Sequence, residues 1–159
     1  MKNEQFSFVV IIIATIIDGN LAGVGLDQVI KQLPARKQIG VVAYSEYFMA
    51  ADLANGRYWY GFVGISAYIL TLGSAFAGYL LNVDSTTIIW LIIAAAFALV
   101  HALGTSQAAP TAFSVRNAIN NEDSLTKIFD KFSKWTSLRG IAGISMFIVM
   151  VWALITITQ

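Results

Sequence analysis

The sequence lacks cysteine altogether and contains only one histidine and two prolines. Without cysteine, the chain can form no disulfide framework and offers no thiol nucleophile. One histidine without cysteine also falls short of the ligand sets that hold zinc in proteins. No glycine-rich loop resembles a phosphate-binding motif. We therefore expect neither a metal ion nor a cofactor in this protein.

Charged residues are scarce as well. They make up 12% of the 159 residues, whereas hydrophobic residues make up 57%; an ordinary soluble domain has about 25% charged residues. The net charge is only +1. We interpret the basic loop residues as topology signals or contacts to anionic membrane lipids, and we expect no nucleic-acid partner. The composition predicts a single integral membrane domain over residues 1–159.

Long apolar runs dominate what is present. A membrane-spanning helix needs about 20 mostly apolar residues, and four segments meet this requirement: 6–26, 59–81, 86–105 and 135–157. These runs are too long and continuous for the strands of a membrane barrel. The sequence therefore predicts an all-α, integral membrane four-helix bundle.

Lysine and arginine are distributed unevenly between the two ends of this bundle. Nine of the ten lie in or next to the loops 27–58 and 106–134, and only Lys2 lies on the other side. Cytoplasmic loops carry the excess of positive charge, so we expect these two loops in the cytoplasm and both termini outside. The expected location is the inner (plasma) membrane of a bacterium.

Both long loops carry helical patterns of their own. We expect Pro34 to mark a turn. After it, apolar residues recur at helical spacing over 35–53, namely Ile39, Val42, Ala43, Tyr47 and Ala50. Asn121 or Asp123 can cap a second helix that starts near Ser124 and runs unbroken into the fourth span. Its apolar stripe consists of Leu125, Ile128, Phe132 and Trp135.

Three ionisable side chains fall inside or at the edge of the spans: Asp18, His101 and Arg139. Each lies on a helix face rich in small residues, which in membranes is the face that packs against other helices. At 1.5 Å per residue, Asp18 lies about 12 Å below the cytoplasmic surface, and His101 and Arg139 lie about 6 Å below it. We therefore expect the three to meet, with Arg139 as the nearest basic partner of Asp18.

Two interpretations of these residues stay open. In the structural one, Asp18 and Arg139 form a buried ion pair that fixes the helix register, and His101 is a hydrogen-bonded core residue. In the functional one, the three form a substrate or proton site. His101 would then be a general base, because its ordinary pKa of about 6.5 suits proton abstraction near neutrality. Asn20 lies toward the lipid side of a straight helix, so either the helix bends at Gly19 or Asn20 faces a neighbouring protomer.

Several features resemble the anthrone oxygenase-like family of small four-helix membrane proteins. They are a glycine-rich first helix, Pro34 near the start of the first loop and Pro110 after the third span. The most specific feature is Trp135 followed four residues later by Arg139, which opens the last helix. The sequence departs from the family at Ala112, where the family often has Asn, and at Ser137, where it often has Asn or His.

The resemblance implies a cofactor-independent oxidation of an anthrone- or quinol-like substrate by O₂. His101 or Asp18 would remove a proton from the substrate, and Arg139 would hold the oxyanion that forms. Trp135, Tyr68 and Asn20 would bind the flat apolar ring system. These residues form the candidate site.

The competing hypothesis is a protein without enzymatic activity. An accessory subunit or a self-assembling bundle would use the Asp18–Arg139 pair for structure alone. Glycine stripes and apolar outer faces favour such a homo-oligomer. A small transporter is disfavoured, because the extracellular half of every span lacks ionisable residues along its dry core.

Overall fold

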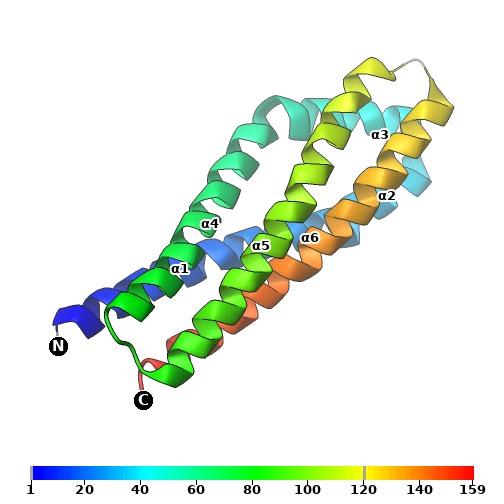
Figure 1. The fold of residues 1–159 in the computed structure, drawn as a ribbon. Coiled ribbons are helices and arrows are strands. Elements are labelled where there is room, and N and C mark those ends of the chain that lie inside the picture. The colour runs from blue at the N-terminus through cyan, green and yellow to red at the C-terminus, as the bar shows by residue number, and fades with distance from the viewer. Residues whose placement is uncertain (1, 120) are drawn as a thin grey trace.

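Four long helices, packed antiparallel, form the computed structural model, which describes residues 2–119 and 121–159 (Figure 1). The long helices are α1 (Lys2–Leu26), α4 (Arg57–Leu80), α5 (Ser85–Ser114) and α6 (Glu122–Thr156). The short elements are η1 (Asp27–Gln32), α2 (Leu33–Ile39), α3 (Val41–Phe48), η2 (Met49–Gly56) and η3 (Val115–Asn117). Both termini lie at the same end of the bundle, and α2 and α3 lie at the other end (Figure 1).

The chain is a membrane protein by the length and composition of its helices. Four continuous helical stretches are long and apolar enough to cross a membrane: Gln5–Ile39, Val41–Leu80, Ser85–Asn117 and Glu122–Thr156. Their large apolar side chains, such as Ile13, Ile69 and Ile92, point outward and are exposed. The predicted all-α four-helix bundle is confirmed.

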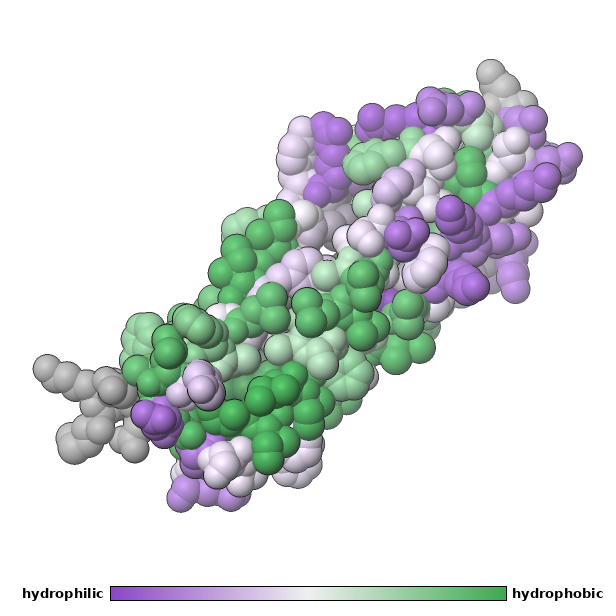
Figure 2. All heavy atoms as spheres, viewed as in Figure 1, coloured by the Kyte–Doolittle hydropathy of each residue, from purple (hydrophilic) through white to green (hydrophobic). Residues whose placement is uncertain are grey.

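The helices are longer than a membrane is thick. The 35 residues of α6 extend over about 52 Å at 1.5 Å per residue, and the hydrocarbon core measures about 30 Å. Figure 2 shows the consequence: a broad hydrophobic band covers the part of the bundle toward the termini, and the opposite end is hydrophilic. The start of α6, the end of α5, α2 and α3 build this hydrophilic end.

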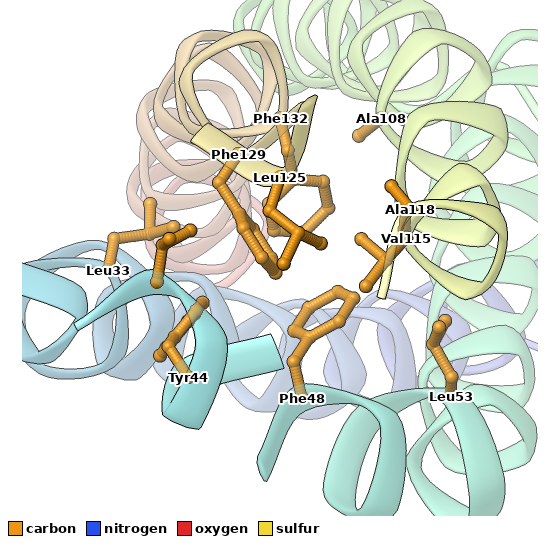
Figure 3. Packing of buried hydrophobic residues seen from close by; sticks show 12 residues of the cluster. Leu33, Tyr44, Phe48, Leu53, Ala108, Val115, Ala118, Leu125, Phe129 and Phe132 are labelled. Atoms are coloured by element: carbon orange, nitrogen blue, oxygen red, sulfur yellow. The ribbon is translucent and has the colours of Figure 1, made fainter. Parts of the chain in front are cut away.

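An aromatic cluster holds the hydrophilic end together, and we call it the aromatic cap (Figure 3). Phe48 of α3 lies edge-on to Phe129 and Phe132 of α6, with ring centroids 5.3 and 5.2 Å apart. Tyr44 lies edge-on to Phe129 at 4.9 Å. Edge-to-face pairs of this kind stabilise the fold beyond what the burial of their apolar area contributes. The cap thereby fixes α3 across the ends of α5 and α6.

The first long loop is helical as predicted, but the expected apolar face is wrong. Ile39, Val42, Ala43, Tyr47 and Ala50 are all exposed. The buried residues are instead Leu33, Val41, Tyr44, Phe48 and Leu53, which face α5 and α6 through the aromatic cap. The periodicity allowed either face, and the buried one is the face whose Tyr44 and Phe48 meet aromatic rings of α6. Pro34 does not mark a turn, because it lies in the first turn of α2, within a helical stretch that continues unbroken from Gln5 to Ile39.

The break in this region falls at Gly40. Its backbone has φ +84°, which favours glycine, and it separates α2 from α3. In the second loop, the Asn121 side chain accepts a hydrogen bond from the backbone N–H of Ser124 at 2.9 Å. This cap confirms the predicted start of α6, which continues unbroken through the fourth span. The helix α5 extends through Pro110 as far as Ser114.

Candidate ligand site

A cavity of about 330 Å³ lies where the membrane-spanning bundle meets the aromatic cap. Most of its wall is apolar, and Phe48, Leu53 and Phe132 of the cap close one side. Arg57 and Ile65 of α4 line the cavity and are also exposed on the outer surface, as is Phe113 of α5. The cavity therefore reaches the outside between α4 and α5, which separate toward the hydrophilic end (Figure 1).

His101 and Tyr68 form a hydrogen-bonded pair on the wall of this cavity. Tyr68 Oη lies 2.7 Å from His101 Nδ1 and 3.2 Å from Thr105 Oγ1. The three side chains form a short chain in which Thr105 donates to Tyr68 and Tyr68 donates to the imidazole, if Nδ1 is the unprotonated nitrogen. Gly143 of α6 makes room for the imidazole, because a Cβ there would lie 3.3 Å from His101 Cδ2. The hydrogen-bonded Tyr68–His101 pair can accept one proton from a bound molecule.

Arg139 lines the same cavity from α6. Its Nη2 donates a hydrogen bond of 2.5 Å to Oε1 of Gln28, and its guanidinium lies 5.7 Å from the centre of the Phe132 ring. Gly104 of α5 allows the close approach of α6, because a Cβ there would lie 3.1 Å from Arg139 Cβ. A guanidinium has five N–H donors, so the Gln28 bond leaves several for a ligand.

A carboxylate that the sequence did not single out completes the polar part of the cavity. Asp52 of η2 lines the cavity and is only 6% exposed. Its Oδ1 accepts a hydrogen bond of 2.9 Å from Tyr60 Oη. Its Oδ2 is buried and has no hydrogen-bond partner among the described residues. Gln28 and Asp52 both lie in π-helical stretches, η1 and η2, and such widened turns are frequent at functional sites.

The expected pairing of Asp18 with Arg139 is wrong. Asp18 is fully buried and accepts a hydrogen bond of 2.8 Å from Thr71 Oγ1. The contact of α1 with α6 sets the register, because Gly25 lies against Gly140 and Gly19 lies against Phe147. Asp18 is thus level with Phe147, about 12 Å along the axis from Arg139. The two charged groups form no ion pair in the part of the chain that the structure describes.

The remaining predicted residues divide between different parts of the molecule. Tyr68 lines the cavity with His101 and Arg139, whereas Asp18, Trp135 and Asn20 do not. Trp135 packs, partly buried, against the aromatic cap. Asn20 is exposed in a shallow groove on the outer side of α1, where its Nδ2 donates to the Ile16 carbonyl at 3.1 Å. A contact between Asn20 and a neighbouring protomer stays a prediction.

Sequence reasoning missed Gln28, Asp52 and Tyr60. All three lie within or next to the first long loop, and no motif marked them. The available signal was Asp52 itself, an acid placed between the apolar residues Phe48 and Leu53 on one helical face. No group of three or more potential metal ligands occurs among the described residues. No protein-family model, curated protein or solved structure matches the chain, so the geometry of the cavity carries the functional argument.

Proposed function

We propose that the protein binds a hydrophobic ring compound of the anthrone or quinol class in this cavity and promotes its oxidation by O₂. The observation that carries the proposal is the hydrogen-bonded Tyr68–His101 pair, 2.7 Å apart, on an apolar cavity wall that also holds Arg139. A volume of about 330 Å³ lies in the range typical of small-molecule sites. A ligand dissolved in the bilayer would reach the cavity between α4 and α5.

The chain's own side chains supply the proton chemistry of this proposal. A proton passes from the ligand to Tyr68 Oη as the proton of Tyr68 passes to Nδ1 of His101. The Arg139 guanidinium stabilises the oxyanion that remains on the ligand, and the apolar wall strengthens this attraction by excluding water. The ligand anion then reacts with O₂. For an anthrone, one oxygen atom becomes the new ring carbonyl and the other leaves as water.

The proposed setting is the inner membrane of a bacterium, with the aromatic cap on the cytoplasmic side. The uneven distribution of lysine and arginine supports this orientation. The alternative of an accessory subunit loses its main structural argument, because Asp18 and Arg139 form no ion pair in the described residues. Self-association stays a separate prediction that is compatible with either function.

The test uses the purified protein in lipid nanodiscs with a dihydroxyanthrone and dissolved O₂. Anthraquinone formation is followed by absorbance and O₂ consumption with an electrode. We expect His101→Phe and Arg139→Gln each to slow the reaction by about 100-fold or more, the usual contribution of a positioned base and of an oxyanion donor, respectively. The control is Phe76→Ala, because Phe76 is exposed on α4 and does not line the cavity.

Circular dichroism and size-exclusion chromatography establish that each variant is folded. Oxidation and binding by folded His101→Phe and Arg139→Gln proteins at the parent's rate and affinity would exclude the proposal. A rate in protein-free nanodiscs equal to that with the parent protein would exclude it as well.

A further inference from the structure

Asp52 presents an unused hydrogen-bond acceptor at the candidate site. Its Oδ1 is bound by Tyr60, and its Oδ2 is buried without a donor among the described residues. A buried carboxylate oxygen without a donor costs free energy, so such groups call for an explanation. The last side-chain torsion of an aspartate is soft, so the carboxylate of Asp52 can rotate to offer Oδ2 to a molecule in the cavity.

Asp18 provides the comparison within the same chain. It is also a buried acid with one bound and one unpartnered oxygen. Asp18 lines neither the cavity nor the groove on α1, so no ligand in either place can complete its hydrogen bonds. Asp52 lines the cavity, so a bound molecule can supply the missing donor.

The charges around the cavity restrict which molecule fits. Its wall holds a buried acid, Asp52, and a partly buried cation, Arg139, and Arg57 lies exposed at its mouth. A fatty-acid carboxylate would be attracted by Arg139 but repelled by Asp52. An amine would be attracted by Asp52 but repelled by Arg139. An uncharged molecule that carries both an oxygen acceptor and a hydroxyl donor satisfies both side chains.

We propose that Asp52 selects ligands with a ring hydroxyl, which donates its hydrogen bond to Oδ2. This inference rests on the proposed function, because it requires a hydrophobic ring compound in the cavity. It adds a specificity that the proposed function does not contain. The site takes a neutral hydroxylated ring, and it discriminates against the same ring without the hydroxyl and against fatty acids.

The experiment measures binding to the parent protein in nanodiscs by equilibrium dialysis under argon, which prevents oxidation. The probes are a dihydroxyanthrone and unsubstituted anthrone, with empty nanodiscs as the background. We expect the hydroxylated probe to bind about 10- to 100-fold more tightly, the range of one hydrogen bond to a charged group. Palmitate added at equal concentration should not displace it.

Two variants connect this ratio to Asp52. Asp52→Leu should bring the affinity ratio close to one while unsubstituted anthrone still binds. Asp52→Asn keeps the side-chain shape and a carbonyl acceptor, so its affinity ratio should fall between those of the parent and Asp52→Leu. This second variant tests the inference even if the leucine variant misfolds. Glu46→Gln is the matched control, because Glu46 is exposed in α3 and does not line the cavity.

The outcomes separate this inference from the proposed function. Equal affinities of the parent for both anthrones, or an unchanged ratio in Asp52→Leu and Asp52→Asn, would overturn the inference and leave the proposed function standing. Displacement of the probe by palmitate would overturn it too. If neither anthrone binds the parent above background, the proposed function fails and the inference fails with it.

Discussion

Single buried polar residues in this bundle depend on individual partners. Thr71 supplies the one hydrogen bond that Asp18 receives from the described residues. Both side chains are fully buried. In such surroundings the loss of a partner costs more than the bond contributes, because the remaining polar group is left without water or donor.

Thr71→Val tests this dependence because it keeps the side-chain shape and removes the hydroxyl. We expect a loss of about 1–3 kcal/mol in the free energy of unfolding, measured by titrating mixed micelles with a denaturing detergent. Thr15→Val is the matched control. Thr15 donates to the Ile11 carbonyl of its own helix. The backbone hydrogen bond of the helix already satisfies that carbonyl, so Thr15→Val should lower the free energy of unfolding by less than about 1 kcal/mol. Equal losses of stability in Thr71→Val and Thr15→Val would contradict the conclusion that buried Asp18 depends on the Thr71 hydroxyl.

At this scale the sequence predicted kinds of residue better than their partners. Tyr68, His101 and Arg139 were expected on buried faces, and they line one cavity. Asp18 was also expected to face inward, and it does. The Asp18–Arg139 pairing was wrong because it depends on the sliding of α1 along α6 by about two turns, and helical periodicity contains no information about that register.

Helix contacts are set by close backbone approach at a few glycines. Gly25 of α1 lies against Gly140 of α6, where a Cβ on Gly25 would come within 3.2 Å of the Gly140 Cα. Small residues in membrane helices permit such contacts. This contact sets the register of α1 along α6, which places Arg139 beside Gln28 rather than beside Asp18.

Gly25→Val should therefore separate α1 from α6 and lower stability by about 1–3 kcal/mol, the usual cost of forcing atoms into a packed contact. The same change should weaken ligand binding, because Gly25 also lines the cavity. Gly73→Ala is the control, since Gly73 is exposed in α4 and an added Cβ would meet nothing within 4 Å. Unfolding in detergent compares the two, and a stability loss in Gly73→Ala as large as in Gly25→Val would argue against the packing explanation.

The start of α5 is stabilised by a titrating cap. Asp84 accepts hydrogen bonds from the Thr87 hydroxyl and from the backbone N–H groups of Thr86 and Thr87. These bonds, that of the Thr87 hydroxyl foremost, hold the pKa of Asp84 below its usual value. A lowered pKa in the folded state means that the stabilisation is complete above the unfolded pKa of about 3.9 and is lost as the pH falls through the folded pKa.

The stability of the parent minus that of Asp84→Asn should therefore decrease as the pH falls below about 4. Asparagine keeps the cap but does not titrate, so the subtraction removes the contribution of the other acids. Asp84→Ala should cost about 1 kcal/mol at neutral pH, the typical loss of a helix cap. Thermal unfolding in detergent at a series of pH values measures both. A difference that stays constant down to the lowest accessible pH would show that Asp84 does not stabilise the helix through its charge.

Elements were predicted well where local chemistry decides them. Asn121 was one of two expected caps and is the one observed. The expected face of the first loop failed, because Tyr44 and Phe48 gain their burial from α6, more than 70 residues away. The same distance explains why Asp52 went unnoticed, since it lines a cavity whose opposite wall comes from α5 and α6.

The charge distribution predicts how the whole molecule is oriented in the membrane. Both termini lie at the apolar end of the bundle, and the hydrophilic end carries the two loops that contain the basic residues (Figures 1 and 2). Positively charged loops stay in the cytoplasm, so the aromatic cap should be cytoplasmic and the turn before α5 should face outside. This arrangement would place the candidate site in the cytoplasmic leaflet.

The absence of cysteine makes this orientation directly measurable, because any introduced thiol is unique in the chain. Ser85→Cys places a thiol at the exposed start of α5, and Asp123→Cys places one at the exposed start of α6, at the other end. In intact bacterial spheroplasts, a membrane-impermeant maleimide should label Ser85→Cys at once and Asp123→Cys only after permeabilisation. The parent protein, which has no thiol, gives the background. Labelling in the reverse order would place the cap outside the cell, and with it the ligand site in the outer leaflet.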